Sequence, residues 1–467
     1  MTKKNIREKS FFERVPHAIT IVFCIILLVT AMTHILPAGT YERINLDGRS
    51  TVVPDSYKVI DSTPIGILQM FKAIPLGFKS ASEIIFIVLA GGIMFGFVEK
   101  SKAIENAIGT LIKKMGLKRK YLIVVIMTFA YGLLGVSVGL ENNIALIPVA
   151  AVLSLALGGD LILAAGISVG AMTIGFGLSP INPYTIGTGH KIAELPMFSG
   201  AFLRTILCSI GLVVMALYNV RYFKKIILND QESLAIGLST KNLTLSKPIK
   251  DYSLSITNWS IIGIFVLGLV LIIYGVFNLD WHINELSAIF LIIAFLTGLF
   301  SKMGGNSMSK IVLESVAVAA PGAFMVGFAT TIKVLMEMGN IGDTISYQLS
   351  IILEGLPLYL SAICMSISQS FINFFIPSGS GQALATLPVM IPLGESLGLT
   401  RQITILAFQV GDGLTNLINP TLGGLIAMLS MSRVPIDRWI RFIFPVLIVL
   451  IIIAFLALII AVAIDYN

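Results

Sequence analysis

The sequence is poor in charged residues. Only 12% of its 467 residues are Asp, Glu, Lys or Arg, whereas 56% are hydrophobic. A soluble domain usually carries roughly 25% charged residues, so the composition excludes an ordinary soluble protein. Several apolar runs approach or exceed the roughly 18 residues that a membrane-spanning helix needs, for example residues 18–36, 84–98, 260–277 and 442–464. The composition therefore predicts a chain that crosses a membrane several times.

Residues that bind metals or react with substrates are also scarce. The three cysteines and four histidines lie far apart, with no spacing typical of a metal site or a disulfide framework. A GxxxxGK[ST] loop for nucleotide phosphates is absent from the sequence. No Ser-His, paired-Asp or metal-ligand arrangement predicts an intramembrane enzyme. We therefore expect no enzyme activity and no cofactor. Transport energy must come from gradients, with Na⁺ and H⁺ as candidate coupling ions, or from a partner protein.

The net charge of +7 does not indicate a nucleic-acid partner, because the basic residues flank apolar runs. Such clusters favour the cytoplasmic side of a membrane. We predict a protein of the bacterial cytoplasmic (inner) membrane, with the N-terminus inside and the C-terminus outside. Residues 40–63 are expected to form a polar loop on the outer side. The three tryptophans end apolar runs, a position typical of the membrane interface: Trp259, Trp281 and Trp439.

Two halves of the chain share a pattern. Residues 139–149 read GLENNIALIPV and residues 379–389 read GSGQALATLPV, and the tripeptide Ile-Asn-Pro follows in both halves, at 181–183 and 418–420. Paired interruptions of apolar segments indicate an internal repeat with a transport site at the repeat interface. The expected order is a cytoplasmic N-terminus (1–16), a first half (17–220), a cytoplasmic linker (221–257) and a second half (258–467).

Each half is expected to contain a re-entrant hairpin and a broken helix. The hairpins are predicted at 120–160 and 357–396, and the broken helices at 161–190 and 402–430. Unwound backbone at membrane depth is tolerated only where it is buried in protein or lines a water-filled cavity. The breaks therefore predict a shared polar cavity, where helix N-termini offer N–H groups to an anion such as a carboxylate.

Candidate substrate-binding residues lie at the hairpin tips and the helix breaks. Those at the tips are Ser137, Glu141, Asn142, Asn143, Ser378, Gly379, Ser380 and Gln382. Those at the breaks are Asn182, Thr185, Asp412, Thr415, Asn416, Asn419 and Thr421. Small residues also allow close helix packing, and Asn and Thr also bond locally to turns. A Na⁺ ion near Asn182 and Asn419 is a further candidate.

Two acidic residues stand out, Glu141 and Asp412, because each lies within apolar membrane sequence, where an ionisable group is costly and indicates function. Each needs a positive partner. The sequence leaves four candidates open: a proton, a sodium ion, a lysine such as Lys333, or a cationic group on the substrate.

Five segments resemble a known family. They read ILPAGTYER, VVPDSYKVI, NPYTIGTGHKIAELP, NFFIPSGSGQALATLPVMIPL and QVGDGLTNLINPT, and they are similar to the YfcC family, relatives of the DcuC dicarboxylate carriers within the ion transporter superfamily. The resemblance implies an inverted-repeat carrier with two re-entrant hairpins and an elevator motion, often dimeric, for dicarboxylates or amino acids, including basic ones. The first tip, GLENN, has a single acid where relatives carry a pair.

Together these observations predict an all-α membrane protein. We expect an inverted repeat of about nine transmembrane helices plus two re-entrant helical hairpins, divided into a scaffold and a mobile transport domain, in a homodimer. We expect a secondary active transporter, either an antiporter or an ion-coupled symporter, for a small carboxylate-bearing solute. The expected solute is an amino acid, with basic ones of the arginine or ornithine type among the candidates. A sodium- or proton-coupled C4-dicarboxylate carrier is the alternative, and a channel would need a more continuous polar lining.

Overall fold

The computed structural model describes residues 18–46, 49–53, 55–138, 140–241, 243–279, 281–353 and 355–467. In the first half its helices are α1 (Ala18–Ile35), α2 (Ile67–Ser80), α3 (Ser82–Lys100), α4 (Ala103–Met115), α5 (Lys120–Val138), α6 (Ile147–Ala156), α7 (Leu161–Ala165), α8 (Ala171–Gly177), α9 (Thr188–Ile192) and α10 (Ala201–Leu228). In the second half they are α11 (Ile256–Asn278), α12 (Ile283–Phe300), α13 (Gly305–Met338), α14 (Gly342–Leu353), α15 (Leu358–Asn373), α16 (Gly379–Ser396), α17 (Arg401–Thr415), α18 (Gly423–Met431) and α19 (Ile436–Ala463).

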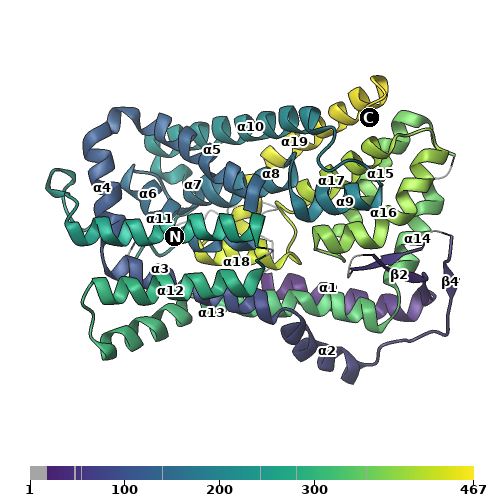
Figure 1. Ribbon diagram of the computed structural model, residues 1–467, viewed down its shortest axis with the longest axis horizontal. Helices are drawn as coiled ribbons and strands as arrows, with labels where there is room; N and C mark the ends of the chain where they lie inside the picture. Colours follow the sequence, from purple (N-terminus) through teal and green to yellow (C-terminus); the bar gives the residue numbers. More distant parts are fainter. Residues whose placement is uncertain are drawn as a thin grey trace, which may run out of the picture.

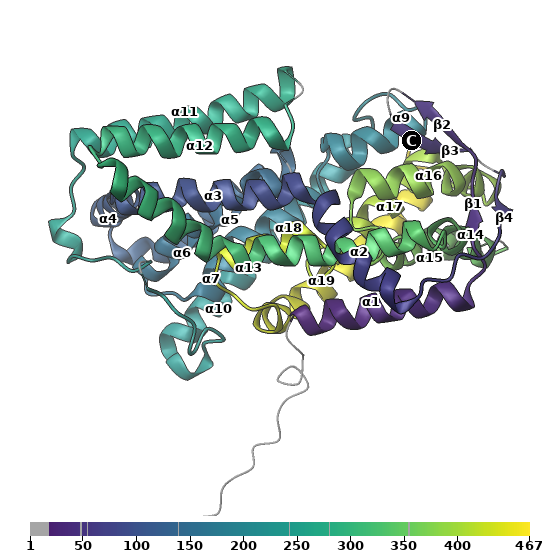
Figure 2. The same ribbon diagram turned by 90° about the horizontal axis from the view of Figure 1, so that it is seen from below.

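The helices form two layers (Figure 1). The lower layer in that view contains α1, α2, α3, α12 and α13, with α13 packed along α1, α2 and α3 and with α12 packed on α3. The upper layer contains α5, α8, α10, α17 and α19, with α5 packed between α8 and α10. Figure 2 shows the lower layer in front, with α13 crossing most of its length. The helices α11 and α12 lie side by side along one edge of this layer, with α12 next to α3.

Five of the described helices are long and apolar enough to cross a membrane: α3, α10, α12, α13 and α19. Their outward faces carry apolar side chains that are about half exposed. On α19, for example, Ile452 is 54% exposed and Leu456 is 53% exposed. Exposed apolar rows on successive helices are costly in water but favourable against lipid. The protein is therefore a mostly helical, multi-pass membrane protein.

The expectation of an all-helical chain is wrong for the segment between α1 and α2. This segment contains four short strands: β1 (Gly39–Thr40), β2 (Arg43–Leu46), β3 (Arg49–Val52) and β4 (Lys58–Val59). Two antiparallel pairs form, β1 with β4 and β2 with β3. In strands of two to four residues the alternation of apolar and polar side chains is too short to distinguish a strand from a polar loop in the sequence.

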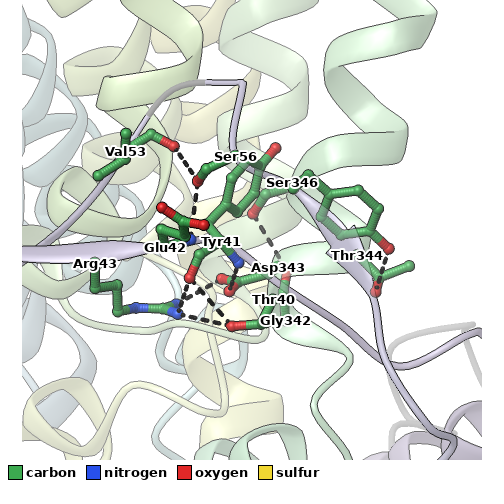
Figure 3. Close-up of polar contacts among 11 residues, drawn as sticks. Thr40, Tyr41, Glu42, Arg43, Val53, Ser56, Gly342, Asp343, Thr344 and Ser346 are labelled. Atoms are coloured by element: carbon green, nitrogen blue, oxygen red, sulfur yellow. Dashed lines mark hydrogen bonds and ion pairs between the residues drawn. The ribbon is translucent and has the colours of Figure 1, made fainter.

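Contacts with α14 hold this strand segment in place (Figure 3). The Asp343 carboxylate accepts a hydrogen bond from the Tyr41 backbone N–H at 2.9 Å and pairs with the Arg43 guanidinium at 2.7 Å. The Tyr57 ring stacks on Tyr347 with centroids 4.1 Å apart. The segment therefore bridges the end of α1 and the start of α14.

The two halves contain similar elements in the same order. A long helix (α3 or α13) leads to a shorter one (α4 or α14), and two helices joined by a short tip follow. In the first half these two are α5 and α6, joined through a 3₁₀ helix η3 (Glu141–Leu146); in the second they are α15 and α16. An interrupted helix then precedes the final long helix, α10 or α19.

The Glu105 side chain of α4 binds Ser246 and Tyr252 of the segment between the halves, and we call this set of contacts the clasp. The Glu105 carboxylate accepts hydrogen bonds from the Ser246 N–H at 2.7 Å, the Ser246 hydroxyl at 2.6 Å and the Tyr252 hydroxyl at 2.6 Å, and it pairs with Lys102 at 2.8 Å. Partial burial disfavours the ionised carboxylate, but the bonds from Lys102, Ser246 and Tyr252 outweigh it and lower the Glu105 pKa to about 2.

This clasp predicts a pH-dependent contribution to stability. Because the pKa of Glu105 is lowered in the folded state, the stabilisation is complete above the ordinary carboxyl pKa and is lost as the pH falls toward about 2. Glu105→Gln should lower the thermal midpoint of the purified protein by about 1–2 °C at pH 7, and the difference from the unmodified protein should shrink below about pH 4. Glu314→Gln, which removes only a 3.8 Å surface pair with Lys310, should change little. An equal effect of Glu105→Gln at pH 3 and pH 7 would contradict the assignment.

Candidate functional site

The two interrupted helices cross at glycines. A Cβ atom added to Gly177, the last residue of α8, would lie 2.7 Å from the Gly413 backbone, and one added to Gly413 of α17 would overlap Gly177. Only residues without side chains allow two helix backbones to approach so closely. The crossing brings the break after α8 and the break after α17 to the same depth of the upper layer.

Asp412 precedes the crossing glycine and is buried, with 1% of its surface exposed. Neither carboxylate oxygen has a hydrogen-bond partner among the described residues. The tip between α15 and α16 is close by, because a methyl group on Gly379 would overlap Thr185 Cγ2 and lie 3.5 Å from Asp412 Oδ2. Thr185 belongs to a short π-helix, η5 (Pro183–Gly187), at the first break. Three of the predicted site residues, Gly379, Thr185 and Asp412, therefore lie next to one another.

Asn373, the last residue of α15, links this point to the second break. Its side-chain N–H groups reach the Asp412 carbonyl at 2.9 Å, the Thr415 hydroxyl at 2.8 Å and the Asn416 side-chain oxygen at 2.8 Å. The Asn419 side chain donates to the Asn373 carbonyl at 2.8 Å. Asn373 therefore fixes the position of the chain that follows Asp412.

Two buried glutamines extend the site along the tip. The Gln382 side chain donates to the Gln369 carbonyl at 2.8 Å and to its side-chain oxygen at 2.7 Å. Together with Thr185, Asn373 and Asp412 they form what we call the polar cluster. Each of its five residues has at least one buried polar atom without a partner in the described part of the chain: Thr185 Oγ1, Gln369 Nε2, Asn373 Oδ1, Gln382 Oε1 and both oxygens of Asp412.

Unpartnered buried polar atoms cost free energy, and a native protein contains few of them. Their concentration in one cluster, where two helix breaks and a tip meet, is typical of a site that is completed by a ligand, an ion or water. The cluster offers one carboxylate, one hydroxyl and three amides. It can therefore bind a cationic group at Asp412 and hydrogen-bonding groups around it.

Other predicted residues bond locally. The Asn182 side chain accepts hydrogen bonds from the backbone N–H groups of Tyr184 and Thr185 at the start of η5. The Asn419 side chain accepts from the Thr421 backbone and hydroxyl, at 3.0 and 2.7 Å. The Ser378 hydroxyl accepts from the Gly381 N–H at 3.3 Å, as the cap of α16. Ser380 is half-buried at the same tip.

The first tip contributes no described contact to the cluster. The side chains of Ser137, Glu141 and Asn142 lie outside the described part of the chain. Asn143 is 4% exposed, and its side chain donates to the Leu134 carbonyl of α5 at 3.4 Å. The predicted role of this tip therefore stays a prediction.

Lys333 is not placed to balance Asp412. It pairs with Glu337 on the same helix at 3.7 Å, and its side chain is 47% exposed. Trp439 does not face lipid, because it is fully buried in the protein and donates its indole N–H to the Leu417 carbonyl at 2.7 Å. This bond satisfies a carbonyl that the second helix break frees. Trp259, by contrast, is 60% exposed.

Gln369, Asn373 and Arg204 are buried polar residues that were not predicted from the sequence. Gln369 and Asn373 are four residues apart in α15 and lie on one face of that helix, a spacing that is visible in the sequence. Arg204 in α10 is fully buried. Its guanidinium donates to Gln409 at 3.1 Å and Gln402 at 2.9 Å, both on α17, and to the Ser199 carbonyl at 2.9 Å, and it lies 5.6 Å from the centre of the Tyr466 ring.

The chain is similar in sequence to known proteins. Residues 15–463 match the family described as "DcuC: C4-dicarboxylate anaerobic carrier". The chain is 27% identical over 468 residues to the "Putative basic amino acid antiporter YfcC" of Escherichia coli (strain K12), covering 91% of this chain and 92% of that protein. It is 24% identical to an uncharacterized protein of Haemophilus influenzae, covering 96% of this chain and 97% of the other.

Two solved transporter structures are also similar. Neisseria gonorrhoeae MtrF matches with a TM-score of 0.44 and 18% identity, covering 96% of this chain and 95% of that one. The Alcanivorax borkumensis YdaH transporter matches with a TM-score of 0.44 and 17% identity, covering 97% of this chain and 99% of that one.

Proposed function

The chain belongs to the DcuC family of C4-dicarboxylate anaerobic carriers, and from that premise we propose that this secondary transporter carries a small amino acid with a cationic group. Membership in a transporter family makes the chain a carrier and not an enzyme. The basic amino acid named for its E. coli relative is the substrate class that fits the polar cluster best.

The observation that carries the proposal is the buried carboxylate of Asp412, which has no partner among the described residues. Placing an ionised carboxylate in a membrane interior is expensive unless a positive charge accompanies it. An ammonium or guanidinium group of the solute would supply that charge at Asp412. The Thr185 hydroxyl and the Gln382 amide lie close enough to the same tip to hydrogen-bond the solute.

The carboxylate end of the solute is proposed to bind at the tip before α16. This helix has 18 residues and begins at Gly379. A helix N-terminus presents unpaired backbone N–H groups and a partial positive charge, both of which favour an anion. Gly379 lies close to Asp412, so one solute could contact both the N-terminus of α16 and the carboxylate.

The second candidate is a C4-dicarboxylate that moves together with Na⁺ or H⁺. The family description favours this substrate class. In that case the cation, not the solute, would balance Asp412, and the two solute carboxylates would bind the N–H donors. Predicted Na⁺ sites near Asn182 and Asn419 belong to this alternative.

We also propose the architecture through which transport occurs. The shared order of elements in the two halves supports an inverted repeat of nine spans, with α5–α6 and α15–α16 as re-entrant hairpins. The two layers of Figure 1 would then be a scaffold and a moving transport domain in a homodimer, with the N-terminus inside. A cavity lined by Arg43, Lys333 and Asp343 reaches Gly381 at the second tip, and it offers a route to the cluster.

Ligand-dependent thermal stability of the purified protein tests the substrate class. A ligand that binds only the folded state raises the midpoint with its concentration. We expect arginine or ornithine, at about 100 times the dissociation constant, to stabilise the protein by about 2.7 kcal/mol, without Na⁺, and Asp412→Asn to abolish the shift. Stabilisation by succinate alone, and only with Na⁺ or at low pH, would replace the amino acid with a dicarboxylate.

A further inference from the structure

A second cavity, remote from the polar cluster in sequence, lies where the end of α10 meets the start of α19. Four basic side chains line it: Arg221, Lys225, Arg438 and Arg441. The segment after α10 closes it and contributes one carboxylate, Glu232. The polar cluster shares none of these residues, so transport chemistry at Asp412 does not account for the cavity.

The basic residues converge because of their spacing on two neighbouring helices. Arg221 and Lys225 are four residues apart on α10, and Arg438 and Arg441 are three apart on α19, so each pair faces one direction. Lys225 pairs with Glu232 at 2.7 Å, and Asp437 lies 3.7 Å from Arg438. Positive charge still exceeds negative charge around the cavity.

Hydrogen bonds and ring contacts hold the walls together. The Tyr218 hydroxyl of α10 donates to the Phe442 carbonyl of α19 at 2.8 Å, and the rings of Tyr218 and Phe442 lie 5.1 Å apart. The Tyr222 hydroxyl donates to Asp160 at 2.7 Å. The Tyr218–Phe442 contacts join α10 to α19, and the Tyr222–Asp160 bond joins α10 to the start of α7. The two helices that carry the four cations are therefore held side by side before any ligand binds.

The surroundings favour a lipid-facing ligand. α10 and α19 lie beside each other along one edge of the molecule (Figure 1). One turn before Arg221, Leu217 is 65% exposed, and beyond Arg441, Ile448 is 45% exposed. An anionic head group in the cavity would therefore leave its acyl chains along the exposed apolar faces of the same helices.

We propose that this cavity binds a phosphate group. That group belongs either to the phosphodiester head group of an anionic phospholipid or to a soluble phosphate. Arginine pairs with phosphate through two parallel N–H···O bonds, and three of the four cations are arginines. Basic pockets between transmembrane helices are a recurrent form of phospholipid recognition.

The test compares thermal midpoints of the full-length protein in phosphatidylcholine nanodiscs with those in nanodiscs that contain increasing phosphatidylglycerol. A separate arm adds inorganic phosphate in phosphatidylcholine alone. Arg221→Gln/Arg441→Gln should weaken the apparent affinity for the phosphate-bearing probe about thirtyfold, since each basic residue contributes about one kcal/mol near an anionic surface. The control Lys302→Gln/Lys310→Gln removes the same charge at exposed positions outside the cavity and should retain the affinity.

Stabilisation by phosphatidylglycerol that the cavity variant loses and the control keeps supports a lipid ligand. The same pattern with inorganic phosphate supports a soluble one. Equal responses of the cavity variant and the unmodified protein, or no response to either probe, would overturn the proposal. If the double variant does not fold, Arg221→Gln alone, whose side chain is exposed, should still weaken the affinity about fivefold.

Discussion

Asp412→Asn is expected to reduce transport by about 10- to 100-fold, because a hydrogen bond to a charged group contributes roughly 1.5–3 kcal/mol. The same substitution should leave the thermal midpoint unchanged or raise it. The carboxylate is buried and has no hydrogen-bond partner among the described residues, so replacing it with a neutral amide removes a desolvation cost. Transport of radiolabelled solute into proteoliposomes and thermal unfolding of the same preparation measure the two effects.

Asp160→Asn is the matched control. The Asp160 carboxylate accepts hydrogen bonds from the Leu163 N–H at 2.7 Å, the Tyr222 hydroxyl at 2.7 Å and the Ser233 hydroxyl at 2.6 Å. Removing this charge should therefore lower stability, the opposite of the result at Asp412. Full transport by Asp412→Asn would show that the carboxylate is not needed for transport. A loss of stability as large as that of Asp160→Asn would show that Asp412 has a structural role.

Gly413→Ala is expected to abolish transport and to destabilise the protein by about 1–3 kcal/mol or more, the usual cost of overpacking. The added methyl group would overlap the backbone of Gly177. Backbone atoms cannot rotate away as a flexible side chain can, so α8 and α17 must separate. That separation would move Asp412 relative to Thr185 and dismantle the polar cluster.

Gly263→Ala in α11 tests whether this effect is specific to the crossing. A Cβ atom at Gly263 has nothing within 4 Å, and Ala favours a helix over Gly by roughly 0.5–1 kcal/mol. The control should therefore be neutral or slightly stabilising in the same thermal and transport assays. If Gly413→Ala behaved like Gly263→Ala, the close crossing of α8 and α17 would be incorrect.

Part of the site could be predicted from the sequence, because some of its residues are unusual types within apolar membrane segments. The glycines and serines of the second tip and the acid in the apolar segment 402–415 identify Gly379 and Asp412, and these residues do lie together. The paired Asn-Pro sequences identify breaks between α8 and η5 and between α17 and α18. Proline ends or interrupts a membrane helix, and a neighbouring polar side chain can bond the freed backbone groups, so the Asn-Pro pairs allow these breaks to be predicted.

The rest depends on which faces of distant helices meet. Asn373 and Gln369 lie in an ordinary helix, and their importance comes from contact with α17 and Gln382, which no local pattern encodes. Arg204 could have been found, because it is an ionisable residue in an apolar run, the same criterion that identified Asp412. The sequence also cannot distinguish a tryptophan at an interface from one, such as Trp439, that anchors a helix break.

The environment of Arg204 limits how the molecule can change shape. Its guanidinium has no carboxylate partner among the described residues, and its acceptors come from α17 and from the chain just before α10. If α10 and α17 moved apart, the guanidinium would lose both glutamine acceptors and keep only the Ser199 carbonyl, so a permanent positive charge in an apolar interior would lose most of its hydrogen bonds, at a cost of several kcal/mol. Any change of shape is therefore expected to keep α10 and α17 together, which sets a lower limit on the size of any part that moves.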